Sequence, residues 1–137
     1  MRLALIVALL AGVGACGSSR SAAPTTTLPF WKTAPTVDMR GKATGTPPTV
    51  QVAVADNTFT PEVVRIDPGV TVVWTNQGSV VHNIEKNSDN FVGQFGDDNL
   101  APGGTYQYRF ASAGVYQYVC NLHTGMVGLI AVGNVAL

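Results

Sequence analysis

The sequence contains few of the residues on which several large protein classes depend. Only 2 of its 137 residues are cysteine, and only 2 are histidine. Two thiols are too few for the iron–sulfur clusters of proteins, which are usually held by four. No segment keeps a sustained helical period, which argues against a helical domain. The length allows one domain, with room for a tail.

Long hydrophobic runs are also scarce, and the longest one lies at the N-terminus. Residues 3–13 form an apolar run that follows Arg2. A membrane-spanning helix needs about 20 apolar residues, whereas a shorter run behind a basic residue is typical of a secretory signal. Residues 13–16 (VGAC) then resemble a bacterial lipobox. We expect a signal peptide over 1–15 and a lipid on Cys16; an ordinary cleaved signal with an incidental cysteine is the alternative.

The segment after this signal has a composition that is typical of a linker. Residues 16–48 are rich in Ser, Thr, Pro, Ala and Gly, and such a segment buries too little apolar surface to order itself. Phe30-Trp31 is the exception, because two adjacent aromatic residues offer apolar surface in this segment. We favour the packing of these two side chains on the following domain over contact with a membrane or with a partner. We therefore expect an exported protein, held by the lipid on Cys16 at the outer face of the bacterial cytoplasmic membrane or in the cell envelope.

Excess positive charge is absent, and this excludes one class of partner. The formal net charge is 0, and residues 48–137 contain three basic and seven acidic residues. A mildly acidic domain is a poor binder of nucleic acid, whose affinity depends on neutralising phosphates. The acidic pair Asp97-Asp98 could steer a basic partner, but a solvated loop is the favoured interpretation.

From residue 49 onward the apolar residues alternate with polar ones. Three examples are Val50-Val52-Val54, Tyr106-Tyr108-Phe110 and Tyr116-Tyr118-Cys120, and turn signals such as Asp67-Pro-Gly69 separate the runs. A period of two over short segments, bounded by Gly and Pro, predicts many short strands. The expected fold class of residues 49–137 is all-β, an antiparallel sandwich or barrel.

Cys120 is a lone thiol if Cys16 carries lipid. In an oxidising compartment such a thiol is usually paired, reactive or bound to something. A disulfide between the two cysteines remains possible, but it would give His123 and Met126 no role. If the strand that leads to His82 lies beside the strand that leads to Cys120, these four side chains converge at one end of the sandwich.

The donor set of these four residues selects a metal. Two imidazoles and a thiolate with a weak thioether are typical of blue-copper electron-transfer sites. Structural zinc is held by Cys and His in a closed tetrahedron, without Met. Taken singly, each residue has an ordinary interpretation as a buried thiol, a polar strand end, a turn residue or a core filler. Their joint spacing favours copper.

The same motifs resemble a known family. VVHN at 80–83 and CNLHTGM at 120–126 are similar to the cupredoxins, the small blue copper proteins that include plastocyanin, pseudoazurin and amicyanin. The C-x2-H-x2-M spacing is that of amicyanin. The resemblance covers about residues 49–133 and extends through 59–61, 67–69, 71–76, 114–120 and 128–132. The lipobox and the long tail depart from the soluble members of the family.

The resemblance implies a Greek-key sandwich with one copper ion. His82, Cys120 and His123 would be the equatorial ligands and Met126 the axial one. Asn83, the residue after the first histidine, would tie the two ligand loops together, with its backbone N–H directed at the cysteine sulfur.

The same residues bear on function. Both histidines are used by this one site, so none remains for a substrate-binding copper centre, and an enzyme is not expected. We expect a monomeric one-electron carrier between redox partner proteins that dock near the exposed edge of His123, beside Leu122, Gly125 and Val127. Copper storage or delivery with the same ligands is the alternative, and a metal-free structural sandwich is a further one.

Overall fold

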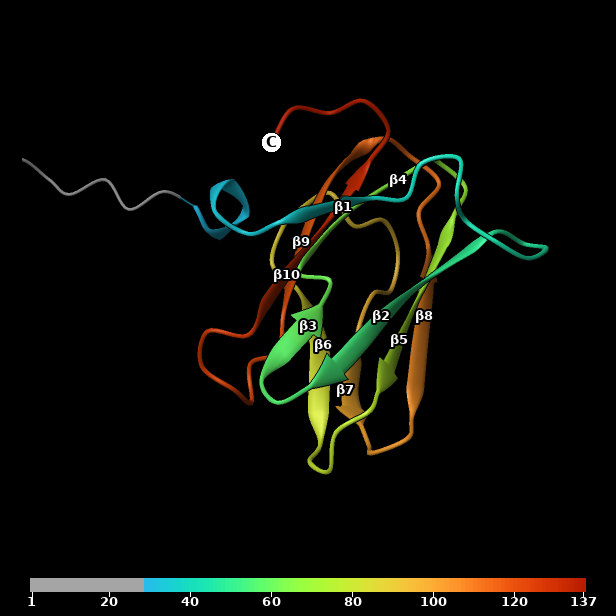
Figure 1. Cartoon of the computed structure of the whole chain (residues 1–137). Coiled ribbons are helices and arrows are strands. Elements are labelled where there is room, and N and C mark those ends of the chain that lie inside the picture. Colours follow the sequence, from blue (N-terminus) through green and yellow to red (C-terminus); the bar gives the residue numbers. More distant parts are fainter. Residues whose placement is uncertain (1–28) are drawn as a thin grey trace, which may run out of the picture.

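The computed structural model describes residues 29–137, which form two β-sheets packed face to face (Figure 1). The elements are η1 (Phe30–Lys32), β1 (Thr36–Asp38), β2 (Thr49–Ala55), β3 (Thr58–Thr60), β4 (Val63–Ile66), β5 (Thr71–Asn76), β6 (His82–Lys86), β7 (Asp97–Leu100), β8 (Thr105–Arg109), β9 (Gly114–Val119) and β10 (Val127–Val132). One sheet has the order β1-β4-β10-β9-β6-β7 and the other β3-β2-β5-β8. The all-β sandwich is confirmed. The expected signal peptide and Cys16 lie outside the described residues.

The core forms between the sheets from the alternating residues that the sequence marks. Val52, Trp74 and Tyr118 are fully buried, while their neighbours in sequence are less buried. Trp74 packs edge-to-face on Tyr118, with ring centroids 5.3 Å apart. Aromatic side chains therefore fill the centre of the sandwich, where such pairs add to the stabilisation that burial alone provides.

The strand pairing differs from the antiparallel sheet that was expected. β2 pairs with β5 in parallel, and β4 lies parallel to both β1 and β10. The chain leaves the four-stranded sheet after β3, adds β4 to the six-stranded sheet and returns with β5, and it crosses again between β8 and β9. Neighbouring strands therefore come from distant parts of the sequence, and several of them run the same way. Both sheets are mixed.

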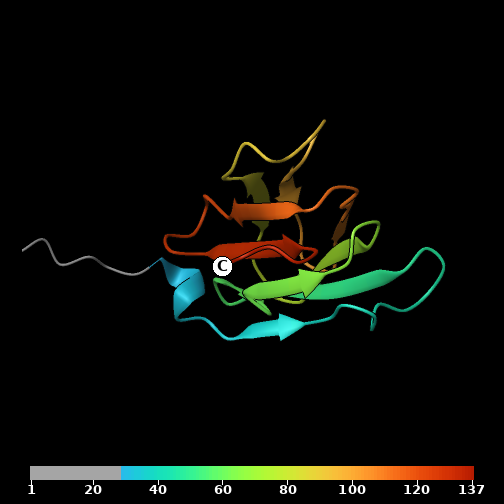
Figure 2. The same cartoon turned by 90° about the horizontal axis from the view of Figure 1, so that it is seen from above.

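The N-terminal segment is also more ordered than expected for a linker over 16–48. β1 extends the six-stranded sheet by pairing with β4, and η1 lies beside the C-terminal residues in both views (Figures 1 and 2). Phe30 and Trp31 pack against Val63, Leu129 and Ala131 on the outer face of that sheet. The apolar face needs a cover, and this segment with the C-terminal residues supplies it. A flexible linker therefore does not describe residues 30–38.

The strand that carries His82 begins at this residue, whereas the sequence suggests a strand that ends there. Val80 and Val81 are exposed and lie before β6. β6 pairs antiparallel with β9, as the convergence of the two motifs requires. A register shift between His82 and Ile84 interrupts the pairing of β6 with β7. Within residues 29–137, no helix is long and apolar enough to cross a membrane.

Candidate metal centre

The loop between β9 and β10 is a tight turn closed by its own backbone. Cys120 N donates to Met126 O at 3.0 Å, and Met126 N donates to His123 O at 3.2 Å. Gly125 has a φ of +81°, a left-handed conformation that costs glycine little. The turn brings Cys120, His123 and Met126 to one end of the sandwich.

His82 reaches the same point from the neighbouring strand. The Cys120 Sγ lies 3.4 Å from His123 Nδ1 and 3.9 Å from His82 Nδ1. The three possible ligand atoms are all within 4.8 Å of one another, and the two imidazole rings are 4.5 Å apart. The structure therefore brings together the three residues proposed as equatorial ligands, and it places Met126 on the same loop.

Burial separates His123 from the other three residues. His82, Cys120 and Met126 are buried, whereas His123 is half-exposed. Burial lowers the pKa of His82 from its ordinary value, and the nearby His123 adds to the effect. The lowered pKa favours the neutral imidazole, which is the form that binds metal.

The donors fit copper better than the other common metals. Both Nδ1 atoms face one sulfur, as a shared ion would require, while His82 Nε2 is buried without a hydrogen-bond partner among the described residues. Within that part of the chain Cys120 forms no disulfide, so its sulfur is available as a ligand. Thiolate and thioether suit Cu(I) and imidazole also suits Cu(II), whereas zinc sites seldom include Met.

Asn83 connects the two ligand segments. Its backbone N–H points at Cys120 Sγ, 3.4 Å away, and its side-chain Oδ1 accepts from Asn121 N at 2.9 Å. The first contact stabilises negative charge on the sulfur. The second fixes the residue that follows Cys120, so the two loops are held together by backbone and side chain alike.

Comparison with known proteins agrees with this donor set. The copper-binding proteins of the plastocyanin/azurin family match residues 48–133, more than half of the chain. The chain belongs to this family, the cupredoxins. Copper is therefore the cofactor of this cupredoxin, and His82, Cys120, His123 and Met126 are positioned as a type 1 copper site.

Individual relatives are similar over the same domain. A chloroplastic plastocyanin of Tetradesmus obliquus is 40% identical over 83 residues, which is 54% of this chain and 57% of that protein. Amicyanin-alpha of Methylorubrum extorquens is 31% identical, over 60% of this chain and 70% of the relative. This cupredoxin thus matches little more than half the length of the plastocyanin. Overall identity is higher to the plastocyanin, although the ligand loop has the amicyanin spacing.

A solved structure is similar in the same region. The structure titled a novel purple cupredoxin from Nitrosopumilus maritimus has 31% identity and a TM-score of 0.55. The similarity covers 61% of this chain and 99% of that one. Almost the whole of that protein therefore corresponds to the sandwich described here.

Two further residues contact the loop and were not singled out in the sequence. Asn121 and Glu85 both bond the side chain of Asn83, at 2.6 and 2.9 Å. Nothing in their local sequence marks them, because Asn and Glu are common on exposed strand ends. The signal lies in the pairing of β6 with β9, which places Glu85 opposite Val119. That register is a property of the folded sheet.

Proposed function

We propose that this cupredoxin is a one-electron carrier whose copper cycles between Cu(II) and Cu(I). The observation that carries the proposal is the convergence of one thiolate and two imidazoles, with Met126 on the same short loop. Bound copper supplies the one-electron couple. A site built from both soft and borderline donors accepts either oxidation state with little change in geometry.

The residues of the chain supply the other requirements of a carrier. The closed turn and the Asn83 contacts hold the ligands in place, so little reorganisation accompanies electron transfer. His82, Cys120 and Met126 are shielded from water, and the half-exposed His123 offers the route to a partner. We infer that redox partner proteins dock near His123.

The surface that would receive such a partner is apolar. Val80, Val81 and Leu122 are 49%, 39% and 53% exposed, and Val81 and Leu122 directly precede the two histidines in the chain. Small apolar contacts of this kind suit brief encounters between redox proteins. A monomer that meets its partners in turn is the simplest form of such a carrier.

An independent enzymatic activity is not part of the proposal. The chain has 2 histidines, and both belong to this site. A second copper centre for substrate would need further imidazoles. The relatives named above are plastocyanin and amicyanin, which supports a carrier.

We place the protein at the bacterial cell envelope, on the basis of residues 1–16. An apolar signal followed by a lipobox supports export and attachment through Cys16. Two or more acyl chains hold a protein stably at a membrane, whereas one chain binds only marginally. Mass spectrometry of the membrane-bound protein, before and after removal of the lipid esters, tests the acylation.

The test of the copper site is the visible spectrum after Cu(II) is added to the purified protein. We expect one copper ion per chain and an intense thiolate-to-copper absorption band. Cys120→Ala should abolish the band, because the thiolate is its source. A weak copper spectrum without this band would show copper binding for storage or delivery, and no bound copper would contradict both functions.

A further inference from the structure

Three polar side chains form a closed hydrogen-bond network next to Cys120. Glu85 Oε1 accepts from Asn83 Nδ2 at 2.9 Å and from Asn121 Nδ2 at 2.7 Å. Asn83 Nδ2 also donates to Asn121 Oδ1 at 2.6 Å. Two amides and a carboxylate are thus joined pairwise, and a single carboxylate oxygen is the acceptor that both amides share.

The network joins the two segments that carry the metal ligands. Glu85 lies on β6, three residues after His82, and it is paired across the sheet with Val119, the last residue before Cys120. Asn121 is the first residue after Cys120. The Glu85 carboxylate therefore links the strand that carries His82 to the residue that follows Cys120, and the Glu85 backbone pairs with the residue before it.

The network includes the side chain of Asn83, the residue whose backbone N–H contacts the cysteine sulfur. Asn83 is 3% exposed, and its backbone N–H is the one that points at Cys120 Sγ. Its side chain has two partners, Glu85 and Asn121, that hold it in one orientation. A carboxylate acceptor makes hydrogen bonds about twice as strong as a neutral acceptor does. Glu85 is therefore the charged anchor of the residue that contacts the sulfur, beside the two hydrogen bonds with Asn121.

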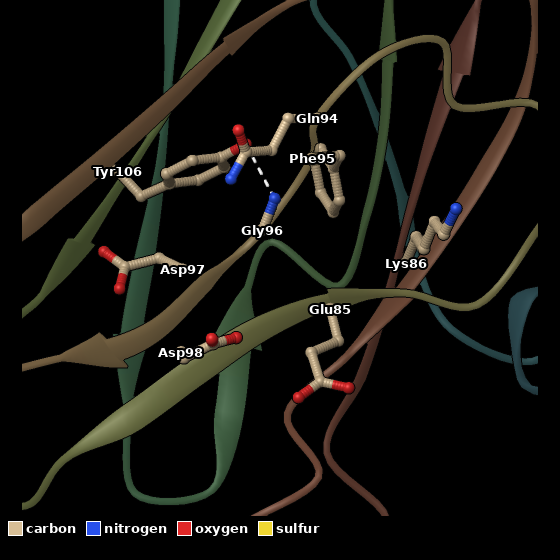
Figure 3. A pocket seen from close by; sticks show the side chains of 8 residues that line it. All are labelled: Glu85, Lys86, Gln94, Phe95, Gly96, Asp97, Asp98 and Tyr106. Atoms are coloured by element: carbon tan, nitrogen blue, oxygen red, sulfur yellow. Dashed lines mark hydrogen bonds between the residues drawn. The ribbon is translucent and has the colours of Figure 1, made fainter.

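In the part of the chain that the structure describes, no ion pair neutralises the charge of Glu85. Within residues 29–137, no lysine or arginine lies within salt-bridge distance of its carboxylate. Glu85 also lines a cleft of about 650 Å³ together with Lys86, Asp97, Asp98 and Tyr106, and it extends away from Tyr106 and Phe95 (Figure 3). The three acids Glu85, Asp97 and Asp98 outnumber Lys86 along this cleft, so its net charge is negative.

We propose that Glu85 is a positioning residue for the copper site and that its charge lowers the reduction potential. The hydrogen bonds hold Asn83 and Asn121 so that the N–H of Asn83 stays directed at Sγ. The negative charge favours the more positive Cu(II) state, because a nearby anion stabilises the higher cation charge. The effect of the charge on the reduction potential rests on the proposed electron-carrier function; the positioning role does not.

Two substitutions separate the hydrogen bonds from the charge. In Glu85→Gln the amide oxygen can still accept from Asn83 and Asn121, but the charge is gone. In Glu85→Ala both the hydrogen-bond acceptor and the negative charge are lost. We expect the reduction potential to rise in both variants, and the shape of the thiolate-to-copper band to change only in Glu85→Ala.

Amide hydrogen exchange of the metal-free protein tests the positioning part directly. The Asn121 N–H donates to Asn83 Oδ1, and its protection depends on Asn83 being held. Loss of about 1.4 kcal/mol of local stabilisation corresponds to a tenfold faster exchange. We expect exchange of the Asn121 N–H to be about tenfold faster in Glu85→Ala and within about twofold of the unmodified protein in Glu85→Gln.

Glu62→Gln is the matched control, since it removes one negative charge from the chain's other glutamate, which lies outside the network. A larger rise in potential for Glu85→Gln than for Glu62→Gln supports the proposal. Equal shifts in potential, or unchanged Asn121 exchange in Glu85→Ala, overturn it. If the unmodified protein shows no thiolate-to-copper band, the proposed function and the charge effect both fail. The exchange measurement then still decides the positioning role.

Discussion

The donor atoms at the copper site differ in how strongly each one holds the metal. Cys120 and the two histidines have their donor atoms within 4.8 Å of one another, the geometry of a common ligand plane. Met126 contributes a thioether, which in blue-copper sites is a weak axial ligand that tunes the potential. It is also almost completely buried, at 1% exposed, so a substitution must keep its volume.

Met126→Leu should retain the thiolate-to-copper band and raise the reduction potential. Leucine has a similar volume, and its substitution for methionine usually costs less than about 1.5 kcal/mol. Loss of the axial thioether leaves three strong donors, a low coordination number that disfavours Cu(II) relative to Cu(I). Redox titration followed by visible absorption measures the potential.

Met39→Leu is the control for this substitution. Met39 is a partly buried methionine that packs against the main core, and it is not among the proposed ligands. Met39→Leu should therefore leave the reduction potential of the copper unchanged. An unchanged potential in Met126→Leu would contradict the axial role.

The buried phenol of Tyr118 should make the free energy of unfolding fall as the pH rises above 10. The side chain is fully buried, and burial raises its pKa above the ordinary value of 10.0. Above pH 10 the unfolded chain releases this proton while the folded chain keeps it, so stability falls as pH rises. The limit is about 1.4 kcal/mol for each pH unit. Tyr118→Phe should show a shallower fall in unfolding free energy between pH 10 and about 12.

A chemical-denaturation series at several pH values measures this difference. Tyr108→Phe provides the control for loss of a phenol, because the Tyr108 O–H donates to Val92 O at the surface. Parallel curves for Tyr118→Phe and the unmodified protein would show that the buried phenol does not set the alkaline slope.

The identity of the ligands was predictable from the sequence, but their outer contacts were not. Cys120, His123 and Met126 lie on one turn, so their spacing alone indicates that they meet. His82 required only that two strands be neighbours, and the pairing of β6 with β9 supplies this. Glu85 and Asn121 depend on the register of that pairing, because a shift of one residue turns a side chain to the other face.

Among the elements, the N-terminal strap (residues 29–44) was the least predictable. Its composition is that of a linker, yet β1 adds to the six-stranded sheet and Thr44 forms a bridge with Thr49. The cause lies in β10, whose residues Gly128 to Val132 are all buried. A strand covered on both faces reads as a continuous apolar run, and something outside the sandwich must cover it.

Removal of the N-terminal strap should destabilise the domain without changing the copper site. A protein that begins at residue 49, and so lacks the strap and the turn at 45–48, should unfold more readily than one that begins at 29. The expected difference is about 2 kcal/mol or more, because Phe30 and Trp31 no longer cover the sheet. Phe30→Ala with Trp31→Ala in the longer protein should reproduce most of the loss.

Denaturant unfolding of both proteins measures this effect. The thiolate-to-copper band should be the same in each, since the strap does not contribute a ligand. Equal stability of the two proteins would show that residues 29–48 do not stabilise the fold.

Close packing between neighbouring strands explains Gly128, a residue that the alternation of apolar and polar residues does not account for. Gly128 is paired with Tyr118 across β9 and β10. A Cβ at this position would lie 2.3 Å from the Tyr118 ring, so no larger residue fits without a shift. The glycine of an otherwise apolar strand is thus required by the aromatic residue of the next strand.

For the whole molecule, the copper end and the N-terminal attachment can be considered together. The apolar residues Val80, Val81 and Leu122 adjoin the two histidines, while Phe30 and Trp31 of the strap pack on the outer face of the six-stranded sheet. Attachment through Cys16 would join the chain at the strap, which supplies none of the proposed ligands. We therefore propose that a tether at Cys16 leaves His123 accessible to partners.

Voltammetry of the copper-loaded protein tests the electron-carrier function most directly. We expect a reversible one-electron couple that persists over repeated cycles, with copper retained in both oxidation states, because the ligand set suits Cu(I) and Cu(II) alike. Loss of copper on reduction, or an irreversible wave in a protein that otherwise binds copper, would contradict the carrier and indicate a protein that stores or delivers the metal.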